Sequence, residues 1–146
     1  SVWEMSNTTG PYSRFQLKQY IEQTQNDLFA DRQLRLMIEN GNRQVVGIVD
    51  LCSFDPLHNR AEVGIMVDKS CRRQGIGRNA LALLEEHCFR YLGIHQLFAY
   101  IAVENLPSRR LFAACGYKES AVLKEWAHTF GGGYTDVLVV QKLNLS

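Results

Sequence analysis

The sequence predicts a mixed α/β fold with a central β-sheet, in one domain over residues 1–146. Strand-like apolar runs alternate along the chain with stretches in which apolar residues recur at helical spacing, which is typical of an α/β architecture. At 146 residues the chain can bury a hydrophobic core without disulfides or metal. The glycines at 131–133 are the one low-complexity stretch, so we expect neither a linker nor an internal repeat.

The first half predicts a helix followed by three antiparallel strands. Ser13 to Gln16 has the pattern of a helix capping box, and apolar residues follow at helical spacing at Leu17, Tyr20, Ile21, Thr24 and Leu28. Residues 34–39 then predict a strand, Asn40-Gly41 a tight turn, and 45–54 the partner strand. A turn at Asp55-Pro56 leads to a third strand over 61–67.

The second half predicts a helix, a strand, a helix and a hairpin. A basic loop precedes a helix with Ala80, Leu84, Cys88 and Tyr91 on one face, and a buried strand follows over 97–103. Pro107 lies where the next helix begins, since its missing N–H costs nothing in a first turn, and Gly116 ends that helix. Residues 122–127 and 134–143 form the final hairpin.

Composition excludes several classes of protein. Sixteen Lys and Arg against fifteen Asp and Glu give a net charge of +1, so we expect neither a nucleic-acid binder nor a membrane-surface binder. No apolar run approaches the ~20 residues of a membrane span. The four cysteines and four histidines are scattered, without the spacing of a metal site. These features predict reduced, mostly buried thiols and a cytoplasmic protein without a metal.

The segment 72–78 is the most informative for chemistry. Gly75 and Gly77 let the backbone come close to a ligand, and the N–H groups that open the next helix favour an anion. Arg72, Arg73 and Arg78 add charge and bidentate donors. The loop therefore predicts a diphosphate site; the alternative is a glycine turn with solvated arginines.

Two well-known phosphate loops fit this segment poorly. The nucleotide-hydrolase loop requires a Lys-Ser or Lys-Thr pair, which does not follow Gly77. The dinucleotide pattern is matched in form by Gly75, Gly77 and Ala80, with Glu104 as the ribose acid. However, residues 69–74 separate the strand from Gly75, where that fold turns almost at once.

The chain resembles the GNAT superfamily of N-acetyltransferases. Arg72, Gly75 and Gly77 fit the family's loop Arg/Gln-x-x-Gly-x-Gly/Ala, and residues 62–68 resemble the splayed strand that precedes it. Residues 105–117 resemble the later Asn-x-x-(Ser/Ala)…Gly-(Phe/Tyr) helix. Ser108 and residues 133–136 look most like the branch of ribosomal-protein N-terminal and diamine (spermidine-type) acetyltransferases.

This resemblance implies an enzyme that uses acetyl-CoA as cosubstrate. Backbone groups of the strand would pair with the pantetheine arm, the loop would hold the pyrophosphate, and the later helix would line the far wall of the cleft. The implied cofactor-binding residues are Ile65, Met66, Val67, Arg72, Arg73, Gln74, Gly75, Ile76, Gly77, Arg78, Asn105 and Ser108. The resemblance also implies that the N–H near Val67 polarises the thioester carbonyl.

The implied reaction is direct attack of a primary amine on the thioester. Since such an amine is mostly protonated at pH 7, a base must take its proton, and Glu62 is the candidate; its alternative is a solvated strand glutamate. Asp136 and Tyr134 are candidates on the substrate side. Phe112 occupies the position at which the family often has a tyrosine that protonates the thiolate. The acceptor class stays open, from a small amine or polyamine to a peptide N-terminus.

The N-terminus departs from the family pattern. A first strand is not recognisable before the Ser13 helix, so we expect a truncated domain in which the strand at 34–39 is an exposed edge. Pairing with a second copy, in a homo-oligomer, could cover that edge. Two other hypotheses are a CoA-binding regulatory module without turnover, which Phe112 makes conceivable, and a nicotinamide-dinucleotide enzyme.

Overall fold

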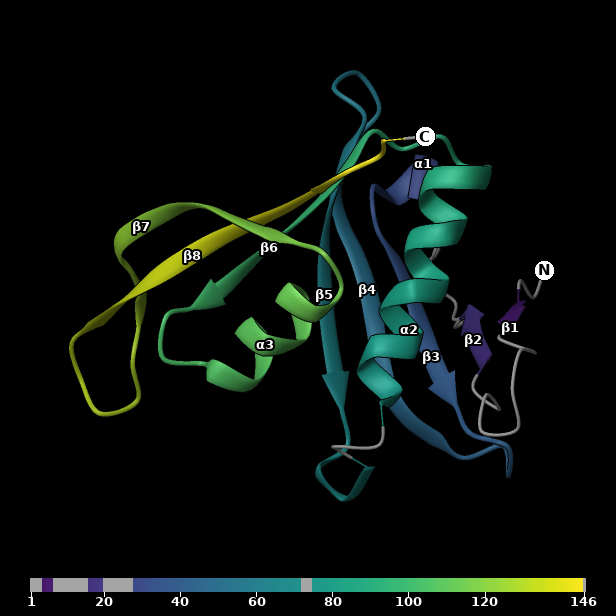
Figure 1. Ribbon diagram of the computed structural model, residues 1–146, viewed down its shortest axis with the longest axis horizontal. Helices are drawn as coiled ribbons and strands as arrows, with labels where there is room; N and C mark the ends of the chain where they lie inside the picture. The colour runs from purple at the N-terminus through teal and green to yellow at the C-terminus, as the bar shows by residue number, and fades with distance from the viewer. Residues whose placement is uncertain (1–3, 7–15, 20–27, 72–74, 146) are drawn as a thin grey trace.

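The computed structural model describes residues 4–6, 16–19, 28–71 and 75–145. Within these residues the chain forms one mixed sheet of eight strands, in the order β1-β2-β3-β4-β5-β6-β8-β7 (Figure 1). Its strands are β1 Glu4–Ser6, β2 Gln16–Gln19, β3 Leu34–Glu39, β4 Val45–Asp55, β5 Arg60–Val67, β6 Gln96–Ala102, β7 Lys118–His128 and β8 Tyr134–Leu143. The chain therefore has the α/β fold with a mixed central sheet that the sequence predicts.

The predicted N-terminal helix is wrong over residues 16–19, although Leu28, its last apolar position, does lie in a short helix. Residues 16–19 form the strand β2 instead of a helix, and β2 pairs antiparallel with both β1 and β3. The alternation of apolar and polar residues around Leu17 also suits a strand, and pairing with the apolar β3 outweighs the local capping signal. The rest of the expected helix, residues 13–15 and 20–27, lies outside the described residues; α1, Leu28–Asp31, follows.

The expectation that the first strand is missing is wrong as well. Strands β1 and β2 precede β3 in the sequence and extend the sheet beyond it (Figure 1). The register places Gln16 opposite Glu39 and Gln19 opposite Leu36, so β3 is paired on both sides. The segment 34–39 is consequently not an exposed edge, and a second copy is not needed to cover it.

Strands β3, β4 and β5 form the predicted antiparallel meander. Leu36, Val49 and Ile65 stand in one row across it. A bulge interrupts the pairing of β4 with β5 between Cys52 and Asp55, and Ser53 there has a positive φ of 51°. The bulge bends β4 at the end of the sheet where the site described below begins.

Two longer helices cover one face of the sheet. These are α2, Ile76–Glu86, which continues as a π-helical turn over His87–Tyr91, and α3, Leu106–Ala114. In Figure 1 both lie on the side facing the viewer, with α2 across β3–β5 and α3 beside the end of β5. Ala80 and Leu84 of α2, and Cys88 of the π-helical turn, are fully buried. They pack in the core with the inward-facing residues of the strands.

The buried face predicted for this helix is wrong at its last residue, Tyr91. Ala80, Leu84 and Cys88 are buried, but Tyr91 is 69% exposed. The π-helical turn explains the difference, because its wider winding rotates Tyr91 away from the position that regular helical spacing predicts. The remaining elements of the second half agree with the prediction to within a few residues, and β8 has the predicted bounds.

Candidate active site

The central strands β5 and β6 separate after a short parallel pairing. Only Arg60 to Glu62 pair with Gln96 to Phe98. Beyond these residues β5 stays with β4 while β6 continues with β8, and the two strands diverge toward their carboxyl ends (Figure 1). The splayed strands that the sequence resemblance implied are therefore present, and α3 lies over the gap that they leave in the sheet (Figure 1).

The backbone of two predicted cofactor-binding residues points toward this gap. Asp68 N–H donates to Val46 O at 2.8 Å, so this pair is a hydrogen-bonded one. Hydrogen-bonded pairs alternate along an antiparallel ladder, and Val67 and Ile65 therefore belong to the intervening pairs whose N–H and C=O groups point away from β4. They point to the side from which β6 has departed, as an added strand would require.

Met66 has the opposite orientation. Its backbone groups face β4, and its side chain is 70% exposed on the face of the sheet away from α2. Side chains alternate along a strand, so Met66 shares this face with Glu62, while Ile65 faces the helices. Three neighbouring residues were predicted to bind the cofactor. The backbone groups of Ile65 and Val67 point into the gap, whereas those of Met66 point toward β4.

The N-terminus of α2 lies next to the end of β5. Gly75 has a positive φ of 75°, and a Cβ added there would meet nothing within 4 Å. At Gly77 a Cβ would lie 3.2 Å from Leu111 Cδ2 and 3.7 Å from Ile65 Cδ1, so this glycine allows α2, α3 and β5 to approach closely. The helix start thus presents open space at Gly75 and tight packing at Gly77.

The other predicted loop residues divide into two groups. Arg72, Arg73 and Gln74 lie outside the described residues. Arg78 is exposed, whereas the side chain of Ile76 is 2% exposed and belongs to the core, so only its backbone is available to a ligand. No side chain of the described residues caps this helix, and its first N–H groups are of the kind that bind anions.

The start of α3 is built by Asn105. Its side-chain oxygen accepts a hydrogen bond from Ser108 N–H at 3.2 Å and so caps the helix, with Pro107 in the first turn. Phe112 is 3% exposed and packs edge-on against Tyr117 with their centroids 4.9 Å apart. Phe112, which stands where the family often has a tyrosine, is thus part of the core and gives the site no proton donor.

Glu62 is half-buried in the row of residues at which β5 and β6 part. It stands opposite Cys52 on β4 and Phe98 on β6. Burial raises the pKa of the Cys52 thiol, and the negative charge of Glu62 raises it further. A carboxylate therefore lies at the apex of the gap, on the face of the sheet opposite the helices.

Asp136 and Tyr134 have structural roles in the β7–β8 hairpin. The Asp136 carboxylate accepts Glu125 N–H at 2.8 Å and pairs with Lys124 at 3.3 Å, so it holds the bulge in β7. The hydrogen bond from Glu125 and the Lys124 charge keep the pKa of Asp136 below its ordinary value. Tyr134 is exposed and packs edge-on against His128.

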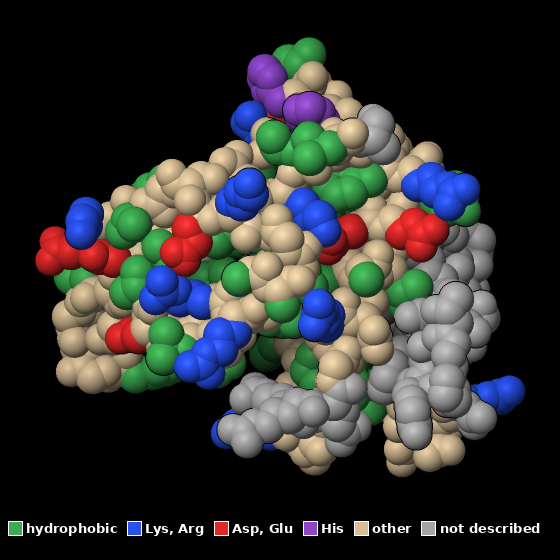
Figure 2. Space-filling view, in the orientation of Figure 1, with side chains coloured by type: hydrophobic (Ala, Val, Ile, Leu, Met, Phe, Trp, Pro, Cys, Tyr) green, Lys and Arg blue, Asp and Glu red, His purple; other side chains and the backbone are tan. Residues whose placement is uncertain are grey.

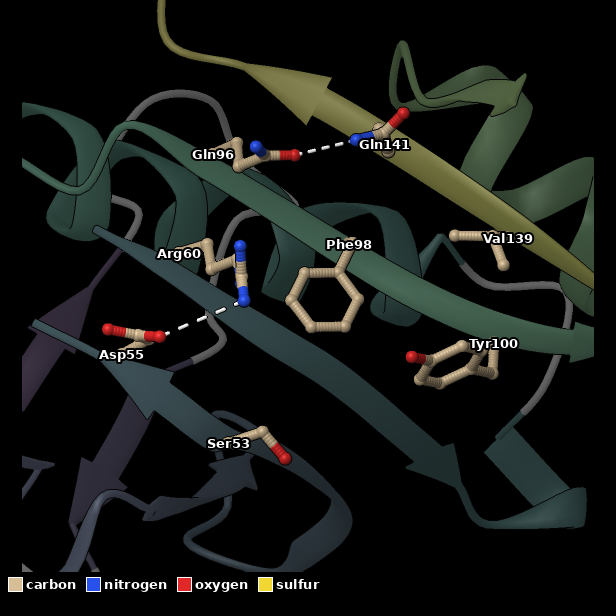
Figure 3. A pocket seen from close by; sticks show the side chains of 8 residues that line it. All are labelled: Ser53, Asp55, Arg60, Gln96, Phe98, Tyr100, Val139 and Gln141. Atoms are coloured by element: carbon tan, nitrogen blue, oxygen red, sulfur yellow. Dashed lines mark hydrogen bonds and ion pairs between the residues drawn. The ribbon is translucent and has the colours of Figure 1, made fainter. Parts of the chain in front are cut away.

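A pocket of about 370 Å³ opens on the helix-free face of the sheet, beside the pairing of β5 with β6 (Figure 3). The sequence analysis singled out none of its residues as site residues, although five of them lie in predicted strands: Ser53, Phe98, Tyr100, Val139 and Gln141. Phe98 and Tyr100 of β6 line it next to the row of Glu62. The full lining is Ser53, Asp55, Arg60, Gln96, Phe98, Tyr100, Val139 and Gln141.

A buried ion pair ties α2 to β8 on the helix side of the sheet. Lys142 Nζ donates to Glu85 Oε1 and, at 2.6 Å, to Cys115 O. Glu85 is 6% exposed, and burial raises the pKa of its carboxyl above the ordinary value while Lys142 lowers it. Glu85 Oε2 and the Tyr117 hydroxyl have no hydrogen-bond partner among the described residues.

The described residues contain neither a cluster that could hold a metal ion nor a helix long and apolar enough to cross a membrane. Their cysteines are free thiols, of which Cys88 is buried, with a pKa raised to about 12 by burial, and the other three are half-buried. On the face that Figure 2 shows, basic and acidic side chains are interspersed, in keeping with the low net charge.

Comparison with known families identifies the fold. The chain matches the acetyltransferase (GNAT) domain family over residues 1–118. It belongs to the GNAT acetyltransferase family. The splayed strands, the glycine-containing loop before α2 and the Asn105-capped helix are the parts of this GNAT chain that the sequence resemblance had indicated.

Similar proteins include polyamine acetyltransferases. The GNAT chain is 27% identical over 128 residues to the spermidine N(1)-acetyltransferase of Vibrio cholerae, covering 87% of this chain and 72% of that protein. It is 35% identical over 96 residues to an N-acetyltransferase 9-like protein of Nematostella vectensis, covering 60% of this chain and about half (48%) of that protein.

A solved structure shows the same architecture. The dodecameric spermidine N-acetyltransferase from Vibrio cholerae superposes with a TM-score of 0.75 at 25% identity, over 80% of this chain and 68% of that one. The homologues thus transfer acetyl groups to amines, and acetyl transfer to a primary amine is the activity consistent with this GNAT domain.

Proposed function

We propose that this protein is an acetyl-CoA-dependent N-acetyltransferase whose reaction centre is the gap between β5 and β6. The observation that carries the proposal is the orientation of Ile65 and Val67, whose backbone groups point to the side that β6 has left, beside the N-terminus of α2. A strand edge next to a helix N-terminus suits a ligand with an amide-containing arm and a diphosphate.

The residues around the gap fit acetyl-CoA. Gly75 leaves open space above the start of α2, and Gly77 holds that start close to β5 and α3. We propose that the backbone at Gly75–Arg78, with Arg72, Arg73 and Gln74, binds the pyrophosphate. Asn105 and Ser108 line the far wall, where the capping bond leaves the amide nitrogen of Asn105 to donate.

In the proposed reaction Glu62 takes a proton from the acceptor ammonium. Acetyl-CoA supplies an activated acetyl thioester. The amine nitrogen forms a bond to the carbonyl carbon, the carbon–sulfur bond breaks, and the nitrogen releases its second proton to solvent as the amide forms. The N–H of Val67 stabilises the charge on the carbonyl oxygen. A thiolate is a stable leaving group, with the thiol of free cysteine near pKa 8.5, so solvent can protonate it where Phe112 cannot.

Cofactor binding has a sharp test in two matched glycine variants. We expect saturating acetyl-CoA to raise the Tm of the wild-type chain by about 5–10 °C at a hundredfold excess over Kd. Gly75→Asp should remove this shift, because it places a carboxylate at the proposed pyrophosphate site. Gly93→Asp is the control, since Gly93 also has a positive φ (65°) and open space but lies after α2.

The outcome is read by differential scanning fluorimetry. Both variants carry the same left-handed strain, so their Tm values without ligand should fall by similar amounts. A normal acetyl-CoA shift in Gly75→Asp would contradict the pyrophosphate assignment. A shift with NAD but not with acetyl-CoA would support the dinucleotide hypothesis instead.

The remaining features of this proposal come from the relatives and from composition. We propose that the acceptor is a small-molecule amine and that the chain self-associates, as the dodecameric spermidine N-acetyltransferase does. A single domain over residues 1–146 and a cytoplasmic location stay predictions. The regulatory CoA-binding module stays the alternative, and acetyl-CoA binding without thiol release over a broad amine panel would favour it.

A further inference from the structure

The pocket on the helix-free face contains a pair of neighbouring hydrogen-bond donors. Arg60 and Gln96 stand directly opposite each other in the parallel pairing of β5 with β6, so their side chains lie side by side in the pocket (Figure 3). A guanidinium and an amide NH2 group at adjacent positions form a donor cluster that suits an oxyanion.

The orientation of the Gln96 amide is fixed by a neighbour. Gln141 Nε2 on β8 donates to Gln96 Oε1 at 2.8 Å. This bond occupies the oxygen of Gln96, and its amide nitrogen has no hydrogen bond to another described residue. The Gln96 nitrogen is therefore the group that this side chain presents to a ligand.

Among the described residues, the one carboxylate that lines the pocket is Asp55, and its hydrogen bonds go to its own turn. Asp55 Oδ1 accepts Leu57 N–H at 2.9 Å and His58 N–H at 3.0 Å. Its other oxygen lies 3.7 Å from Arg60 Nη2, an ion pair longer than a hydrogen bond. Within the described residues this is the single polar contact of the Arg60 guanidinium, which keeps N–H donors for a ligand oxygen.

The donor pair lies at a fixed distance from the proposed base. Arg60 and Glu62 are two positions apart on β5 and on the same face, so their Cα atoms are about 7 Å apart. Phe98, which stands opposite Glu62 on β6, lines the pocket, so the pocket adjoins the row that contains Glu62. A molecule whose amine reaches Glu62 would thus place a group a few bonds away against Arg60 and Gln96.

We propose that this pocket binds a carboxylate or similar oxyanion of the acceptor, and that the acceptor is an amino-acid-like compound with its amine a short carbon chain from an acidic group. The inference rests on the proposed function and names the substrate class of the same site. A polyamine fits less well, because a second ammonium would face the Arg60 guanidinium and the Gln96 donors.

The test compares acids with their neutral amides. Glycine, γ-aminobutyrate and ε-aminocaproate are assayed beside glycinamide, γ-aminobutyramide and ε-aminocaproamide, with spermidine as the polyamine. Binding is measured by calorimetry in the presence of CoA, and turnover by thiol release from acetyl-CoA. We expect at least one acid to bind about 10- to 100-fold more tightly than its amide and than spermidine, as charge-assisted hydrogen bonds predict.

Two variants assign that preference to the donor pair. Gln96→Glu keeps the oxygen that accepts from Gln141 and replaces only the amide nitrogen, so it should abolish the preference for the acid and strengthen spermidine binding. Arg60→Gln should also abolish it. Arg90→Gln is the control, since Arg90 is an exposed arginine paired with Glu86 on the π-helical turn and should leave the preference unchanged.

Each outcome decides for or against the carboxylate subsite. Equal binding of acids and amides, tighter binding of spermidine, no binding of any acid, or an acid preference that survives both Gln96→Glu and Arg60→Gln would overturn it. Acid-selective binding without thiol release would support the subsite and contradict the proposed acetyl transfer. Thiol release with spermidine alone would support acetyl transfer and overturn the subsite.

Discussion

Replacing Glu62 by glutamine is expected to lower kcat by about 10²–10⁴-fold, the range of a lost general base. The side chain keeps its size in the row of Cys52 and Phe98, so acetyl-CoA binding should not change. The loss should shrink as the pH approaches the pKa of a free primary amine, about 10.4, since the acceptor is then already neutral. Initial rates of thiol release from pH 6 to pH 10, followed for both proteins, measure this effect.

A matched glutamate separates a base from a general loss of charge. Glu86 lies on the exposed side of α2, and Glu86→Gln should leave the rate unchanged. If Glu62→Gln lost less than about tenfold, or the same factor at every pH, Glu62 would not be the group that takes the amine proton.

Replacing Lys142 by methionine is expected to destabilise the fold by about 3 kcal/mol, the lower end of the range for breaking a buried ion pair, because Lys142 is partly exposed. The variant leaves the Glu85 carboxylate buried without its cation and removes the hydrogen bond to Cys115 O. Urea unfolding measures the change. Lys124→Met is the control, since Lys124 is 80% exposed in its pair with Asp136 and should cost less than about 1 kcal/mol.

The pH dependence of this variant follows from Glu85. Burial raises the folded-state pKa of Glu85 above the ordinary 4.5, so the folded chain holds a proton that the unfolded chain releases. Stability linked to Glu85 is therefore lost as pH rises through the folded-state pKa, and removal of Lys142 raises that pKa further. The loss in Lys142→Met should be smaller near pH 5 than near pH 8. An equal loss at both values would contradict the burial of a charged Glu85.

The sequence predicted correctly those helices and strands in which the spacing of apolar and turn residues matches the contacts made in the fold. The meander β3–β5 has turn residues between strands of alternating burial, and α2 begins after Gly75, a glycine with positive φ. Two separated motifs, around Gly75 and Asn105, sufficed to indicate the GNAT family and the splayed strands. The spacing of residues is informative in these two motifs because both form turns and helix starts, and the residues that build a helix start are close together in the sequence.

Other features depend on contacts that spacing does not encode. Gln16–Gln19 pairs with a strand distant in the sequence, so its helical spacing misled the prediction. Tyr91 is displaced by a π-helical turn that no residue pattern announces. The Arg60–Gln96 pair arises where two strands meet in parallel, and strand register is not visible in a single sequence.

The central claim is acetyl transfer to a primary amine at the gap between β5 and β6, and recovery of a labelled acetyl group tests it most directly. The chain is incubated with acetyl-CoA that carries an isotope-labelled acetyl group and with a panel of primary amines. We predict labelled amide in a one-to-one ratio to free CoA thiol, lost in Glu62→Gln and in Gly75→Asp. Bound acetyl-CoA without labelled amide, or thiol release without it, would contradict the account.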